Sequence, residues 1–257
     1  MTDPPARPAP DPLPPLPEDG IASVLCIVAH PDDMEYGASA AVHAWTRTGV
    51  AVDYALMTSG EAGMAQAPEV VGPLREVEQR AACRAVGVRE LEFLGHPDGM
   101  LEPGLALRRS VARVVRRHRP DVVLTANFEV EAYGGLNQAD HRATGLAVVD
   151  GLRDAANPWV FRELAEVEGL AAWSVGALLV AGHERPTHAK AVAQEDVDAA
   201  VASLHCHAAY LAHVTGHPAP EDFIPELLRA GGEAAGAEHA VALRVHDLGG
   251  LGSRDRS

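Results

Sequence analysis

Two polar segments of the sequence carry side chains that can bind a metal ion. The first, Ala29-His30-Pro31-Asp32-Asp33, follows a continuous apolar run, and the second is Gln138-Ala139-Asp140-His141. An imidazole and a carboxylate three residues apart in a tight turn can face one point, and an imidazole from another loop can join them. An aspartate here also suits the N-cap of a following helix. A cap explains one aspartate, but not a histidine, a proline and a second aspartate.

The donor types indicate which metal fits. His30, Asp33 and His141 supply two imidazoles and one carboxylate, and they leave a coordination position open. Such a set is typical of catalytic Zn²⁺, with Fe²⁺ as the rival. We therefore predict a metal site formed by these three residues.

The elements that must position these loops alternate between short apolar runs and longer helical patterns. The apolar runs predict strands at residues 24–29, 50–57, 91–94, 122–125 and 173–181, and an edge strand at 240–246. Helical patterns cover residues 38–47, 74–86, 105–118, 141–154 and 197–212. Continuous apolar strands separated by helices indicate a parallel sheet buried on both faces. We predict a single α/β domain with a Rossmann-like, doubly wound, mostly parallel sheet.

The carboxyl ends of such strands are where ligands bind. Glu61 follows the second strand, so it either lines the site or is a solvated loop acid. His96 follows the third strand, and His188 comes after the fifth. We expect the region after the fifth strand to contribute substrate specificity.

Composition limits the class of protein. The chain has 257 residues and a formal net charge of −15, which disfavours binding to nucleic acid or to an anionic membrane. Three cysteines without a C-x-x-C pair predict a reducing, cytoplasmic location. Residues 1–20 are proline-rich and lack a secretory signal pattern, which predicts a disordered arm before a domain at residues 21–257.

The motifs together resemble the PIG-L/LmbE-type deacetylase family. The likeness rests on Ala-His-Pro-Asp-Asp after the first strand and Asp-His-Arg-Ala-Thr-Gly after the fourth, and it extends over residues 24–182. The resemblance implies a zinc-dependent hydrolase of N-acetyl groups on amino sugars or glycosides. It implies that His30, Asp33 and His141 hold zinc.

The resemblance also implies roles for other residues. Asp32 would be the general base that activates a metal-bound water, and it would later return the proton to the leaving amine. Arg75 and Asp98 fall where family members contact substrate hydroxyls.

One position departs from the family pattern. Gln138 and Ala139 stand where many members have His-Pro, and that histidine assists the oxyanion or the proton transfer. A neutral amide donates a hydrogen bond but supplies no proton, so the departure predicts either a slower enzyme or a metal-holding binding protein.

These patterns predict an enzyme that acts on a small N-acylated molecule, with no expectation for its oligomeric state. The alternatives are an amidase acting on a thiol-conjugate amide, a catalytically impaired ligand-binding protein, and a nucleotide-binding Rossmann module. No glycine-rich fingerprint follows the first strand, which disfavours the nucleotide module.

Overall fold

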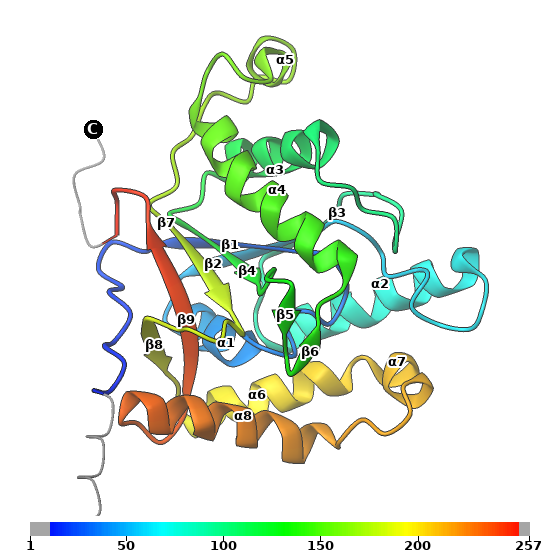
Figure 1. The fold of residues 1–257 in the computed structure, drawn as a ribbon, viewed down its shortest axis with the longest axis vertical. Helices are drawn as coiled ribbons and strands as arrows, with labels where there is room; N and C mark the ends of the chain where they lie inside the picture. Colours follow the sequence, from blue (N-terminus) through cyan, green and yellow to red (C-terminus); the bar gives the residue numbers. More distant parts are fainter. Residues whose placement is uncertain (1–10, 252–257) are drawn as a thin grey trace, which may run out of the picture.

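The computed structural model describes residues 11–251, which form a central sheet with helices on both faces (Figure 1). The main sheet has the strand order β3-β2-β1-β4-β7-β9-β8. Its strands are β1 (Ser23–Val28), β2 (Ala51–Leu56), β3 (Glu90–Phe93), β4 (Val122–Ala126), β7 (Ala177–Ala181), β8 (His188–Ala191) and β9 (Ala240–Asp247), and β5 (Glu131–Ala132) pairs with β6 (Gly135–Leu136) in a separate hairpin. The first five of these strands run parallel, which confirms the predicted single α/β domain.

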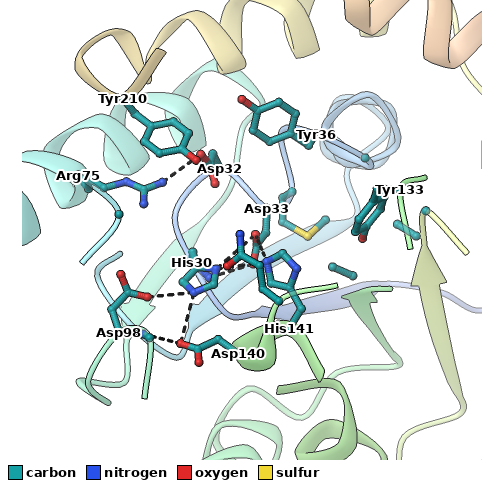
Figure 2. Close-up of a pocket in the computed structure, with 18 of the residues that line it drawn as sticks. His30, Asp32, Asp33, Tyr36, Arg75, Asp98, Tyr133, Asp140, His141 and Tyr210 are labelled. Atoms are coloured by element: carbon teal, nitrogen blue, oxygen red, sulfur yellow. Dashed lines mark hydrogen bonds and ion pairs between the residues drawn. The ribbon is translucent and has the colours of Figure 1, made fainter. Parts of the chain in front are cut away.

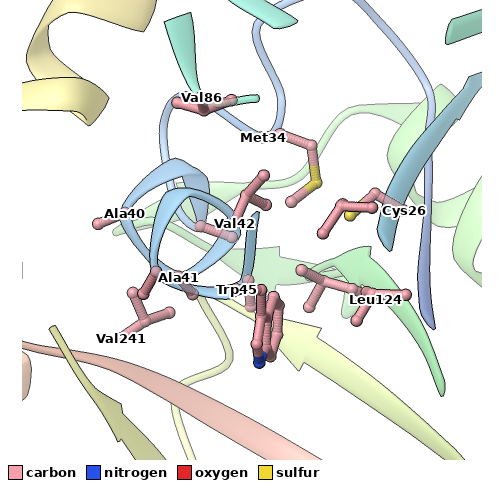
Figure 3. Packing of buried hydrophobic residues seen from close by; sticks show 14 of the residues in the cluster. Cys26, Met34, Ala40, Ala41, Val42, Trp45, Val86, Leu124 and Val241 are labelled. Carbon is pink, nitrogen blue, oxygen red and sulfur yellow. The ribbon is translucent and has the colours of Figure 1, made fainter. Parts of the chain in front are cut away.

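The helices divide between the two faces of the sheet. They are α1 (Ser39–Arg47), α2 (Pro68–Ala85), α3 (Leu105–His118), α4 (Ala139–Ala156), α5 (Arg162–Glu166), α6 (Gln194–His205), α7 (Ala208–His213) and α8 (Pro220–Ala235). Successive side chains of a strand point to opposite faces. Cys26 therefore packs with Trp45 of α1 (Figure 3), whereas Leu25 and Ile27 pack against α3 and α4. Burial on both faces fixes β1 and thus the start of the loop that follows it.

The C-terminal strands differ from the prediction. β9 was expected at an edge, but it lies antiparallel between β7 and β8, pairing Leu179 with Val245 and Lys190 with Val241. The short strand β8 had no clear apolar alternation in the sequence. It nevertheless takes the outer position of the sheet.

Part of the N-terminal arm is ordered, so the prediction of disorder to residue 20 is wrong for residues 11–20. Leu16 is buried, its amide donates to the carbonyl of Ala189 in β8, and the amide of Ala189 donates to Pro14. An extended proline-rich segment can pair with an edge strand through the groups that proline retains. Residues 1–10 of the predicted arm lie outside the described residues.

Helix α2 begins earlier than the sequence indicates. Pro68 occupies its first turn, where the missing amide hydrogen is tolerated, and Pro73 lies inside the helix. The helix predicted at residues 74–86 therefore begins six residues earlier, at Pro68.

The predicted helix at 197–212 is interrupted. α6 ends at His205 and α7 begins at Ala208, with the fully buried His207 between them. The amide of Ala209 donates to Oε1 of Glu78 in α2 at 2.6 Å, whereas in a continuous helix it would bond to a carbonyl one turn back. This contact turns α7 toward the carboxyl ends of the strands. Within residues 11–251, no helix is both long and apolar enough to cross a bilayer.

A buried ionic cluster lies in strand β2. Asp53 is 2% exposed and accepts hydrogen bonds from Arg89 and, at 3.0 Å, from Nδ1 of His118. The hydrogen bond from His118 to Asp53 raises the pKa of His118 to about 9, and a hydrogen bond to Glu92 acts in the same direction. Because this pKa is raised on folding, the stabilisation is complete below about pH 6.5 and is lost as the pH rises through 9.

We therefore expect His118→Gln to lower the free energy of unfolding by about 2 kcal/mol at pH 6, and by much less above pH 9. Urea titrations at several pH values measure this difference. The exposed His213→Gln serves as the control and should show no such dependence. A loss that stayed constant with pH would exclude a charged His118.

Candidate active site

The loops that follow β1, β2, β3, β4 and β7 meet at the carboxyl edge of the sheet and line a cavity of about 480 Å³. Figure 2 shows the polar side chains gathered on one side of this cavity. They come from segments more than 100 residues apart in the chain. The predicted loops therefore do meet, at the position expected for a parallel sheet.

Three side chains converge as a candidate metal set. Nδ1 of His30, Oδ1 of Asp33 and Nε2 of His141 lie 3.1–3.7 Å from one another. Ligand atoms at about 2.0–2.1 Å from a tetrahedral zinc ion are separated by about 3.3 Å. The spacing and the chemistry of this donor set therefore fit a zinc-like ion.

Backbone amides aim the Asp33 carboxylate. Its Oδ2 accepts from the amides of Ala29 and His30 at 3.0 and 2.9 Å, which leaves Oδ1 to face the imidazoles. Burial alone raises the pKa of Asp33, but the neighbouring His141 and His30 hold it well below its usual range. The carboxylate is thus ionised and oriented toward the candidate metal position.

The His141 ring is oriented by a residue that the sequence analysis did not assign. Oδ1 of the buried Asn137 lies 2.9 Å from Nδ1 of His141, while Nδ2 of Asn137 donates to the carbonyls of Asn127 and Glu129. Because a carbonyl oxygen only accepts hydrogen bonds, the side-chain atom of Asn137 that contacts the two carbonyls must be the nitrogen. The other atom, Oδ1, therefore faces the His141 ring. Nδ1 of His141 then donates, and its Nε2 keeps a lone pair for a metal.

The second nitrogen of His30 faces two carboxylates. Nε2 lies 3.0 Å from Asp98 and 3.5 Å from Asp140, and these three residues form a second candidate group. Asp140 also accepts from the amides of Gly99 and Leu101. If Nε2 donates to these acids, Nδ1 of His30 is available for the first group, so we take Asp98 and Asp140 as orienting groups.

Asp32 lines the same cavity as the candidate metal set, and its carboxylate also contacts Arg75. It is 5% exposed and has a φ of +79°, a left-handed conformation that is costly for residues other than glycine. Gln79 accepts its amide hydrogen at 2.9 Å, and Gln79 itself donates to the buried Glu35. Burial raises the pKa of Asp32 to about 7, although the positive guanidinium of Arg75 acts to lower this pKa.

Arg75 is held by the protein itself. It is 3% exposed, its Nη2 lies 3.0 Å from Asp32 and donates to the carbonyl of Pro31, and the ring of Tyr210 covers the guanidinium. Gly60 makes room for it, because a Cβ there would lie 2.4 Å from Nη1. Arg75 reaches the cavity as predicted, but its contacts are those of a group that holds Asp32.

The remaining predicted residues divide between the cavity and its surroundings. Gln138 is exposed and lines the cavity, and within residues 11–251 the structure records no hydrogen bond to its side chain. Glu61 is not among the lining residues, because its carboxylate accepts from the amides of Ser59 and Asp98 and joins two loops. His96 bonds to Ser110, and His188 lies on β8 beside Thr187; neither lines the cavity.

Sequence reasoning missed several residues of the site. Asn137 directly precedes Gln138, and Asp140 directly precedes His141. Their closeness in sequence to a predicted ligand could have identified both as residues of the site. Tyr36, Tyr210 and Phe223 also line the cavity. The position of Tyr210 depends on the break before α7, which no local pattern in the sequence indicates.

Comparison with known proteins connects this geometry to a family. The model of the PIG-L family, described as GlcNAc-PI de-N-acetylase, matches residues 25–152. The chain is 32% identical over 139 residues to a probable N-acetyl-alpha-D-glucosaminyl L-malate deacetylase 2 of Bacillus anthracis, covering 50% of this chain and 58% of that protein. It is 30% identical over 146 residues to a diacetylchitobiose deacetylase of Thermococcus kodakarensis, covering 55% and 53%. The chain thus spans little more than half the length of these relatives.

A solved structure extends the likeness over most of the fold. The N,N'-diacetylchitobiose deacetylase of Pyrococcus horikoshii superposes with a TM-score of 0.75 at 20% identity, covering 90% of this chain and 86% of that one. At this identity the likeness concerns the fold.

The orienting contact of Asn137 gives a test of the candidate metal set. We expect Asn137→Ala to weaken Zn²⁺ binding by about 10–100-fold, because the His141 ring loses its acceptor. Asn137→Asp keeps an acceptor oxygen and should retain more of the affinity. Calorimetric titration with the metal measures both variants against the exposed Asn157→Ala as control. Unchanged affinity in Asn137→Ala would mean that Asn137 does not orient His141 for metal binding.

Proposed function

Because the chain belongs to the PIG-L family, we propose that it is a metal-dependent N-deacetylase acting on an amino-sugar substrate. The observation that carries this proposal is the convergence of His30, Asp33 and His141 on one point in a cavity that Asp32 also lines. The two relatives support the reaction, since both are named as deacetylases of acetylated amino sugars, one of them as a probable deacetylase.

Zn²⁺ suits the donor set, and Fe²⁺ is the rival for the same three residues. A zinc ion bound there supplies Lewis acidity, which lowers the pKa of a water molecule and polarises an amide carbonyl. His30 and His141 contribute neutral imidazole nitrogens, and Asp33 contributes the negative charge. Asn137, Asp98 and Asp140 hold the two rings in the required orientation.

Asp32 is the proton carrier in this proposal. Its carboxylate takes a proton from the attacking water and returns it to the amine that leaves. Arg75 and Gln79 keep the carboxylate and the backbone of Asp32 in place. Because Asp33 already occupies the ligand position of this turn, Asp32 remains available for proton transfer.

Gln138 is the donor that we assign to the developing oxyanion. Its side chain lines the cavity at the N-cap of α4, next to the loop that carries Asn137. An amide stabilises negative charge through a hydrogen bond but carries no positive charge. We therefore expect the rate of hydrolysis with Gln138 to be lower than the rate with a histidine at this position.

The reaction is tested by measuring acetate release from a panel of N-acetylated amino sugars after loading the purified protein with Zn²⁺ or Fe²⁺. Metal-dependent release supports the proposal. Metal binding without release from any member of the panel would favour a ligand-binding protein instead. Cleavage confined to thiol-conjugate amides would favour the amidase alternative.

The role of Asp32 predicts a separation of metal binding from catalysis. Asp32→Asn should bind zinc with unchanged stoichiometry while the rate of acetate release falls by about 10²–10⁴-fold. Elemental analysis and a steady-state assay on one preparation measure both quantities. A fully active Asp32→Asn variant would show that another group is the base.

The role of Gln138 predicts opposite effects of two substitutions. Gln138→Ala removes a donor and should lower kcat about tenfold or more, whereas Gln138→His should raise kcat above the wild-type value. Zinc content serves as the control for both variants. A fall in Gln138→His would indicate that the amide has a fitted role of its own.

A further inference from the structure

We propose that the cavity contains a subsite for an uncharged aromatic group attached to the amino sugar, formed by Tyr36, Tyr210 and Phe223. This inference rests on the proposed deacetylase function, because it names the class of substrate that the same cavity accepts. The three residues come from the loop before α1, from α7 and from α8.

The three side chains form one braced wall. The ring of Phe223 lies 5.9 Å from that of Tyr36 in an edge-on arrangement, and the ring of His217 packs against both at 5.2 and 5.9 Å. Tyr210 lies flat over the guanidinium of Arg75, 4.1 Å from its centre. Figure 2 shows Tyr36 and Tyr210 beside Asp32, on the side of the cavity away from Asp98 and Asp140. Aromatic rings held in this way are preorganised to contact another ring.

Within residues 11–251, no residue that lines the cavity supplies an unpaired positive charge. Arg75 is the one arginine or lysine among these lining residues, and it is buried against Asp32. The acids Asp33, Asp98 and Asp140 face His30 and His141. An anionic group on the substrate would therefore find no free cationic side chain among them, and the net charge of −15 would repel it.

A second sugar fits the wall poorly. A ring with several hydroxyl groups needs hydrogen-bond partners for each of them, and leaving these groups unpaired in a site lowers affinity. On this side of the cavity the polar groups are the hydroxyls of Tyr36 and Tyr210 and the paired Asp32 and Arg75, and apolar atoms form most of the cavity surface. An aromatic ring buries apolar area without that penalty.

Small residues leave space for such a ring. Gly37, Ala126, Ala181 and Gly182 also line the cavity. Gly182 has a φ of +67°, and a Cβ there would lie 2.7 Å from the ring of Tyr133. Glycine at this position therefore makes room for the ring of Tyr133, which lines the cavity as well.

Two of the three wall residues lie outside the family match. Tyr210 and Phe223 follow residue 152, the last residue that the PIG-L model covers. The malate and chitobiose groups in the names of the relatives therefore do not determine what this wall contacts.

The experiment compares kcat/KM for four glycosides of N-acetylglucosamine, each as both anomers: phenyl, methyl, a second sugar, and an aglycone that carries a carboxylate. We expect the phenyl glycoside to exceed the methyl glycoside about tenfold, and the carboxylate glycoside to fall below it. A highest value for the second sugar or for the carboxylate would overturn the proposal, as would equal values for phenyl and methyl.

Variants assign the preference to the wall. Phe223→Leu and Tyr36→Leu retain apolar volume but remove a ring, so each should lower the phenyl-to-methyl ratio several-fold. Trp159→Leu, at a residue that is 75% exposed and outside the cavity lining, should leave this ratio unchanged. A ratio that is unaffected by both wall variants would overturn the assignment.

Binding of the deacetylated phenyl and methyl glucosaminides, measured by calorimetry, separates this proposal from the proposed function. Tighter phenyl binding that Phe223→Leu abolishes supports the subsite even if no glycoside is hydrolysed, and the deacetylase function then fails alone. Hydrolysis with equal binding of both products means that the subsite fails while the function stands.

Discussion

The site depends on the way one carboxylate is bonded in the turn after β1. Oδ2 of Asp33 accepts hydrogen bonds from the backbone amides of Ala29 and His30. These bonds close a turn in which Asp32 has a positive φ. Neighbouring aspartates consequently point in different directions: Asp33 faces the two imidazoles, and Asp32 faces Arg75. Two acids adjacent in sequence thereby acquire environments that shift their pKa values in opposite directions, which suits the roles that we propose for Asp33 as a ligand and for Asp32 as a base.

Charge pairing around that turn explains how so many ionisable groups coexist in one cavity. Each acid faces a histidine or an arginine, and each of these partners is also held by a carbonyl or another acid. Burying an unpaired charge costs several kcal/mol, so the pairs must form together. The groups in the cavity that remain available to a substrate are consequently hydroxyls, one amide and aromatic rings. The charged side chains of the cavity are already paired with one another.

The sequence predicts the sheet, the edge at which the loops meet, and the convergence of His30, Asp33 and His141. These features depend on local signals, because an apolar strand and a polar motif directly after it can be read from adjacent residues. The path of the C-terminal region depends on contacts between distant residues. The bond between Glu78 and the amide of Ala209 breaks a helix that looks continuous, and the pairing of Leu16 with Ala189 orders a proline-rich segment. Neither contact leaves a periodic signal in the sequence.

The break before α7 has an evolutionary consequence. The residues that we propose for metal binding and proton transfer all precede residue 152. Tyr210 lies on α7 and Phe223 on α8, which packs against α6, β8 and β9. Substitutions in α7 and α8 can therefore alter which molecules enter while the reacting groups keep their geometry. A fold arranged in this way can change the molecules that it recognises through a short C-terminal segment, without altering the loops after β1 and β4.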